Sequence, residues 1–193
     1  MRAGRRLNFK DNHYKTISSE PIFKGKVLNL YLDEILSPDG RKSSREVVEH
    51  SGGVAILALT DDGEVYFVSQ YRHPVGENVL EIPAGKLEPG ENPFDCAIRE
   101  LAEEVGVKPG NMEQITVFYT SPGYTSEKLY IFLATKLEKV ARQKQEDEDL
   151  EVILIPLQEA VDMAKKSTIS DGKTMIALLL VAGIIKDRPQ YTI

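Results

Sequence analysis

Three glutamates, Glu100, Glu103 and Glu104, are the residues whose types and spacing point most directly to chemistry. Separations of three and four residues place side chains next to one another on a helix surface, where like charges repel. A cation would offset that repulsion, and Mg²⁺ binds carboxylate oxygens together with water and substrate phosphates. The spacing therefore suits a helix that carries divalent cations. Taken alone, however, these residues favour a solvated acidic helix face, because charge runs usually lie on the surface.

The segment around the glutamates has the signals of a loop followed by a helix. After the loop Lys86 to Asn92, Asn92 can cap a helix and Pro93 suits its first position. Gly106 supplies the left-handed residue that ends a helix. The sequence therefore predicts a helix over Pro93 to Val105. Residues at helical spacing predict its buried face: Phe94, Ala97, Ile98, Leu101 and Val105.

Residues 85 to 107, GKLEPGENPFDCAIRELAEEVGV, resemble the box of the Nudix hydrolases. That box is glycine, five residues, glutamate, seven residues, then Arg-Glu-aliphatic-any-Glu-Glu-any-Gly-aliphatic. Every specified position is filled, by Gly85, Glu91, Arg99, Glu100, Leu101, Glu103, Glu104, Gly106 and Val107. The resemblance covers roughly residues 52 to 186. It implies an α+β protein with the Nudix fold, a mixed β-sheet sandwiched between helices (α/β/α), in which the box forms a loop-helix-loop.

The resemblance assigns a metal site to the box. Glu100 and Glu104 are the expected metal ligands, with the backbone carbonyl of Ala84 as a further ligand. Glu103 stands beside them as a candidate catalytic residue. The expected cofactor is Mg²⁺, with Mn²⁺ as a substitute, at two or more ions per site.

Four further box residues are expected to support this structure. Glu91 and Arg99 should hold the loop against the helix through an ion pair, which is support for the ligands rather than chemistry. Gly85 and Gly106 belong to the same supporting set.

Residues outside the box resemble the ADP-ribose pyrophosphatase subfamily, in which a proline follows the box glycine by about sixteen positions, as Pro122 follows Gly106. By this resemblance Arg72 contacts the diphosphate or the terminal ribose, and Glu127 approaches the ribose. Alternatives remain: an ordinary turn at Pro122-Gly123, and surface ion pairs for Arg45 and Arg72. The full set of expected substrate-binding residues is Arg45, Glu46, Arg72, Glu81, Ser121, Pro122, Gly123 and Glu127.

The implied reaction is Mg²⁺-dependent hydrolysis of the diphosphate bond of ADP-ribose, or of a related nucleoside diphosphate sugar, to AMP and ribose 5-phosphate. Other Nudix substrates, such as GDP-mannose or a dinucleoside polyphosphate, would use the same metal site. A non-catalytic ADP-ribose sensor is an alternative of another class, disfavoured by the intact box.

The acidic run Gln145 to Asp149 is the expected source of the water-activating base. Several ADP-ribose hydrolases place a glutamate in this loop as a base or further metal ligand. Glu148 is the first candidate, because it leads directly into the next predicted strand, and Glu146 is the second.

Two regions are predicted along the chain. Residues 1 to 50 form an N-terminal segment, loose through Ser19 until something ties it down, and a β-hairpin. A lone hairpin is marginally stable, so it should pack on the main domain or on a partner chain. Subfamily members exchange these strands, which implies a homodimer in which Arg45 and Glu46 reach a ligand across the interface. Residues 51 to 193 form the hydrolase domain.

Within the main domain, apolar runs separated by turn signals predict alternating strands and helices. The predicted strands are 54–59, 65–68, 79–82, 115–119, 129–135 and 152–156, and the predicted closing helices are 157–165 and 171–186.

Composition narrows the class of protein. The chain has 193 residues, 41% hydrophobic and 28% charged, as expected of a globular protein. A net charge of -6 disfavours nucleic acid as a partner. The single cysteine, Cys96, suits a reducing cytosol, and the absence of a signal-like or membrane-length apolar run predicts a cytoplasmic protein with no membrane partner.

Overall fold

The computed structural model describes residues 13–142 and 150–187, which fall into two compact units. Among these residues, the N-terminal unit contains residues 13–50 together with the loop Ser121–Ser126. The main unit contains Ser51–Thr120 and the described residues from Glu127 to residue 187.

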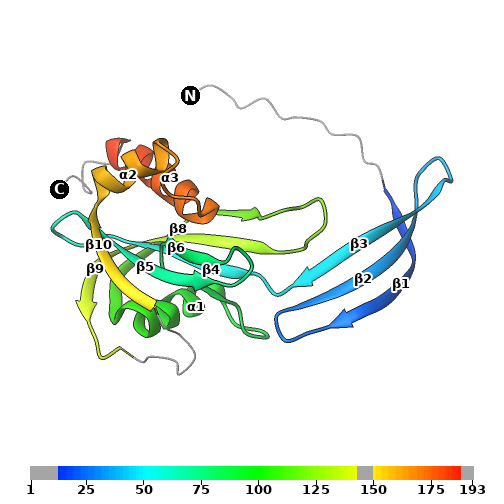
Figure 1. Ribbon diagram of the computed structural model, residues 1–193, viewed down its shortest axis with the longest axis horizontal. Helices are drawn as coiled ribbons and strands as arrows, with labels where there is room; N and C mark the ends of the chain where they lie inside the picture. The colour runs from blue at the N-terminus through cyan, green and yellow to red at the C-terminus, as the bar shows by residue number, and fades with distance from the viewer. Residues whose placement is uncertain (1–12, 143–149, 188–193) are drawn as a thin grey trace. The chain divides into compact units, whose positions relative to one another are not determined.

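The N-terminal unit is a three-stranded antiparallel sheet in the order β1-β2-β3 (Figure 1). Its strands are β1 (Lys15–Lys24), β2 (Leu28–Leu36) and β3 (Lys42–His50). The predicted hairpin is therefore present, with Gly40 at a φ of 82° in its turn. The prediction that the chain is loose through Ser19 is wrong from Lys15 onward, because β1 pairs with the free edge of β2 and satisfies backbone groups there.

The loop Ser121–Ser126 is attached to the last strand of this sheet. The Val48 N–H donates to the Tyr124 carbonyl at 2.8 Å, and the Ser126 N–H donates to the Val48 carbonyl at 3.0 Å. The Ser126 hydroxyl also accepts a hydrogen bond from the His50 N–H at 3.1 Å. A segment that lies more than seventy residues further along the chain is thereby placed beside β3.

The main unit is built on two sheets, one of four strands with mixed directions and one of three antiparallel strands. Its strands are β4 (Gly53–Ala58), β5 (Glu64–Arg72), β6 (Glu77–Glu81), β7 (Ala84–Lys86), β8 (Val107–Tyr119), β9 (Lys128–Lys139) and β10 (Leu150–Pro156). They form the orders β10-β5-β6 and β7-β4-β9-β8, and a bridge between Leu59 and Val65 joins β4 to β5. The pair β4 and β9 is parallel and the other pairs are antiparallel.

Helices cover both faces of the four-stranded sheet, because the side chains of β4 point alternately into two core clusters. Ala55 and Leu57 pack in one core cluster with α2 (Leu157–Lys165) and α3 (Gly172–Asp187). Val54 and Ile56 point the other way, into a cluster with α1 (Pro93–Glu100). Figure 1 shows α2 and α3 together on the side of the strands opposite α1. The predicted α/β/α sandwich is confirmed. No helix in the described part of the chain is long and apolar enough to cross a membrane.

The predicted helix over residues 93–105 has two parts. α1 begins as expected, with the Asn92 side chain accepting from the Phe94 N–H at 2.8 Å. From Leu101 to Val105 the chain continues as a π-helix, η1, which ends at Gly106 with a φ of 68°. The wider turn was not predicted, because apolar spacing does not distinguish it from an α-helical turn. Phe94, expected on the buried face, is 43% exposed. Single π turns occur often at functional sites.

Candidate active site

The box carboxylates are withdrawn from solvent. Glu100 and Glu104 are only 5% and 3% exposed, and the Glu103 side chain is largely covered. The alternative of a solvated acidic helix face is therefore wrong. Burying ionised carboxylates costs free energy unless they are paired or bind a cation.

A single guanidinium, that of Arg99, binds three of the surrounding carboxylates. It pairs with Glu91 at 2.9 Å, Glu100 at 2.7 Å and Glu103 at 3.0 Å. The hydrogen bonds from Arg99 lower the pKa of Glu91 to about 2 and, in turn, raise the pKa of Arg99 above its ordinary value. The expected ion pair between the loop and the helix is present, and the contacts with Glu100 and Glu103 add charge compensation that the sequence did not predict.

A short strand lies against the helix at the same place. β7 pairs with β4, which sets Gly85 opposite Val54 and Ala84 opposite Ala55. The Ala84 N–H donates to the Glu104 Oε2 at 3.0 Å. The Glu100 carboxylate lies directly over Gly85, so that a Cβ at this position would overlap it. The box glycine is therefore required because no side chain fits between the strand and the carboxylate.

The donor set suits a hard divalent cation. Glu100 and Glu104 are buried carboxylates, and the backbone N–H of Ala84 binds Glu104. Among residues 13–142 and 150–187, no three acidic, histidine or cysteine side chains form a complete metal-binding group. Mg²⁺ typically takes one or two protein carboxylates and completes its shell with water and substrate phosphates, so the two buried carboxylates fit this ion.

A second network surrounds the predicted residues Arg72 and Glu81. Arg72 donates from Nε to Glu81 Oε1 at 2.6 Å and from Nη2 to Oε2 at 2.8 Å. Burial acts to raise the pKa of Glu81, but Arg72 and Lys173 outweigh it and the pKa lies below its ordinary value. Lys173 was not predicted. The only sequence signal was Asp171, whose side chain accepts from the Thr174 N–H at 3.0 Å in the first turn of α3.

The other predicted substrate-binding residues are divided between the units. Arg45 and Glu46 lie exposed on β3, in the same unit as the turn that contains Ser121, Pro122 and Gly123. Glu127 belongs to the main unit, where its carboxylate accepts from the Thr120 hydroxyl at 2.6 Å. The candidate bases Glu146 and Glu148 lie outside the described residues.

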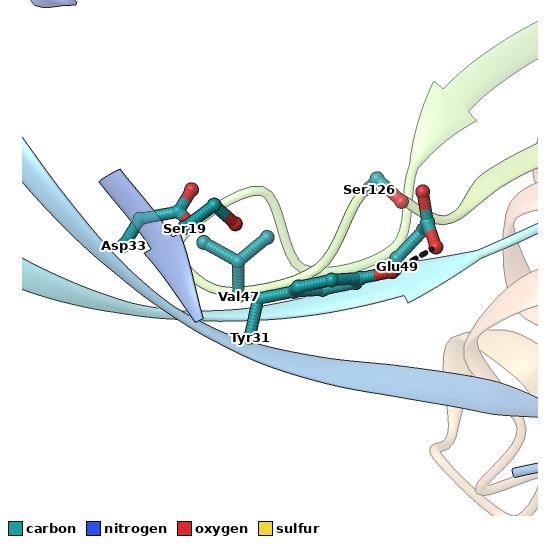
Figure 2. A pocket seen from close by; sticks show the side chains of 6 residues that line it. All are labelled: Ser19, Tyr31, Asp33, Val47, Glu49 and Ser126. Atoms are coloured by element: carbon teal, nitrogen blue, oxygen red, sulfur yellow. Dashed lines mark hydrogen bonds between the residues drawn. The ribbon is translucent and has the colours of Figure 1, made fainter. Parts of the chain in front are cut away.

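The N-terminal unit contains a polar pocket of about 430 Å³ (Figure 2). The Tyr31 hydroxyl donates to the Glu49 carboxylate at 3.3 Å, and one buried oxygen of Asp33 has no hydrogen-bond partner in the described part of the chain. The lining residues are Ser19, Tyr31, Asp33, Val47, Glu49 and Ser126. None of them was predicted as a site residue.

A mixed sheet between helices, with two buried glutamates on a loop-helix segment, defines the class of protein. The NUDIX domain model matches residues 49–178, so the chain belongs to the Nudix family and is a pyrophosphohydrolase. Residues 14–48 match a second model, described as the nucleoside diphosphate sugar hydrolase N-terminal domain.

Similarity to individual proteins extends over most of the chain. An ADP-ribose pyrophosphatase from Bacillus subtilis (strain 168) is 43% identical over 166 residues, 85% of this chain and 90% of the relative. A methanol dehydrogenase activator from Bacillus methanolicus is also 43% identical, with the same coverage of both chains. The crystal structure of an ADP compounds hydrolase matches with a TM-score of 0.80, over 90% of this chain and 95% of that one. At 22% identity, that last match shows the fold alone.

Proposed function

We propose that this enzyme hydrolyses the diphosphate of ADP-ribose to AMP and ribose 5-phosphate with Mg²⁺ as its cofactor. The observation that carries the chemistry is the buried pair Glu100 and Glu104, held against Ala84 and Gly85 within a complete box. The choice of ADP-ribose is supported by the 43% identity to a relative of that activity and by Pro122, sixteen positions after Gly106.

In this proposal each group has one task. Glu100, Glu104 and the Ala84 carbonyl would hold the cation, which when bound neutralises diphosphate charge and lowers the pKa of an attacking water. Arg72, whose charge Glu81 stabilises, would bind the anionic diphosphate. The water is activated by a glutamate base, for which we propose Glu148 first and Glu146 second, with Glu103 as the candidate inside the box.

A substrate panel tests this proposal. With Mg²⁺, ADP-ribose is expected to give AMP and ribose 5-phosphate in equal amounts, and EDTA is expected to abolish turnover because the carboxylate pair needs a cation. GDP-mannose and a dinucleoside polyphosphate are the comparison substrates, with products identified by chromatography. Faster turnover of either would displace ADP-ribose. Binding of ADP-ribose without any turnover would instead favour the sensor alternative.

We also propose that two copies of the chain assemble through the N-terminal sheet. Large apolar side chains are exposed on this small unit, among them Ile22 at 54%, Phe23 at 57% and Val27 at 59%. Ile22 and Phe23 lie on β1 and Val27 lies in the turn that follows it. Exposed apolar side chains that form a contiguous patch are typical of a protein interface. Such an interface would also place Arg45 and Glu46 next to a partner, as their position on β3 permits.

Replacing Phe23 by glutamate is expected to weaken the dimer more than tenfold, because a charge would be buried in an apolar contact. Analytical ultracentrifugation over a concentration series measures the dissociation constant. Phe23→Leu, which keeps an apolar side chain at the same position, is the matched control and should remain dimeric. A wild-type chain that sediments as a monomer at all concentrations would contradict the proposal.

A further inference from the structure

One buried carboxylate in the main unit binds two cations at once. Glu81, at the end of β6, is only 2% exposed. Arg72 of β5 holds both of its oxygens, at 2.6 and 2.8 Å, and Lys173 of α3 also binds Oε2. The same Lys173 ammonium pairs with Asp171 at 2.9 Å. Two carboxylates and two cations thus form one network with no net charge.

Lys173 occupies a fixed position because the start of α3 is fastened to the end of β6. The Thr174 hydroxyl accepts from the Ile82 N–H at 2.9 Å and donates to Asp171 at 2.6 Å. Thr174 is fully buried and the Lys173 side chain is only 15% exposed. A lysine normally extends into water on a flexible stem, so this ammonium has been withdrawn from solvent toward Glu81 and Asp171.

Arg72 differs from Lys173 in that part of its charged group faces a pocket. The pocket has a volume of about 390 Å³ and is lined by Arg72, Glu81, Asp171 and Lys173, among others. The Arg72 side chain is 40% exposed, and only its Nε and Nη2 have acceptors within the described residues. A guanidinium carries five N–H donors, so its outer edge can bind a ligand while its inner edge stays on Glu81.

We propose that Lys173 is a positioning residue: by sharing Glu81 with Arg72 and neutralising Asp171, it keeps the outer edge of the Arg72 guanidinium turned toward the pocket, where it binds the substrate's diphosphate. The inference rests on the proposed function for the identity of that anion. Without Lys173, Glu81 Oε2 and Asp171 would each lack one cation. Arg72 is then the cation that remains, bound to both oxygens of Glu81 and lining the same pocket as Asp171. Its guanidinium would turn inward to pair with Glu81 and Asp171, and its N–H donors would no longer face the pocket.

The test compares three variants in steady-state kinetics, on whichever panel substrate the wild type hydrolyses best. Lys173→Met removes the charge and retains most of the stem. It is expected to raise KM about tenfold or more with kcat within about threefold, because a contact shared by ground and transition states is lost. Lys173→Arg restores a cation and is expected to bring KM back to within about threefold of wild type. Lys165→Met removes a lysine charge from the exposed end of α2, outside this network, and should leave KM unchanged.

The crystal structure of the Lys173→Met variant supplies a readout that needs no substrate. The Arg72 guanidinium is expected to move from its two-oxygen contact with Glu81 toward Asp171. An unchanged KM in Lys173→Met, or an equal rise in KM in Lys165→Met, would overturn the inference. If no substrate in the panel is hydrolysed, the proposed function fails. The crystal structure then decides alone, since an unmoved Arg72 rejects the positioning role and a displaced one supports it.

Discussion

Replacing Glu104 by glutamine is expected to lower kcat about a thousandfold. A loss of this size corresponds to the several kcal/mol by which a bound metal ion stabilises the transition state of a phosphoryl-group reaction. The substitution removes a buried charge but retains an oxygen that can accept from the Ala84 N–H, which the carboxylate does at 3.0 Å. It also removes like-charge repulsion from a helix that carries Glu100 and Glu103. Loss of activity without loss of folding is therefore the expected result.

Kinetics at saturating Mg²⁺ and thermal unfolding without metal measure the two effects separately. Glu138→Gln, on the exposed part of β9, removes the same charge outside the site and serves as the control. That variant should retain wild-type kcat. A drop in Tm of Glu104→Gln that accounts for the lost activity would show that Glu104 is structural.

The second large loss of activity is expected from adding a single methyl group at Gly85. Gly85→Ala places a Cβ where the Glu100 carboxylate lies. Residue 85 cannot move far because β7 is paired with β4, and Glu100 cannot move far because it belongs to helix α1. The carboxylate must be displaced, so kcat should fall about a hundredfold or more, the loss typical of one misplaced electrostatic group. Overpacking of this kind should also destabilise the fold by about 1–3 kcal/mol.

A glycine elsewhere in the main unit provides the matched control. At Gly183 in α3 an added Cβ meets no atom within 4 Å. Gly183→Ala should leave kcat unchanged and raise stability by roughly 0.5–1 kcal/mol, the difference in helix propensity. The pair is compared by kcat and by denaturant unfolding. Wild-type kcat in Gly85→Ala would mean that the position of Glu100 does not matter for turnover.

Much of this protein was predictable from local sequence because the relevant contacts are local. Asn92 caps α1, Gly106 ends the following turn, and α2 has the predicted bounds, since each depends on residues within about four positions. The continuous apolar run over residues 54–59 predicted the buried strand β4 by the same logic. The resemblance to the Nudix box implied the ion pair of Glu91 and Arg99, eight residues apart.

The burial of the site carboxylates depends on segments that are distant in the chain, and no local sequence pattern encodes these long-range contacts. Glu104 is covered because β7, twenty residues earlier, pairs into the sheet beside it. Glu81 meets Lys173 across ninety-two residues, and β3 meets Ser126 across seventy-six, because sheet register and helix packing bring them together. Spacing in the chain therefore determined which carboxylates could act as a group. Long-range pairing of strands and packing of helices determined which carboxylates are buried and which cations they share. It also brought Lys173 to Glu81 as one of those cations.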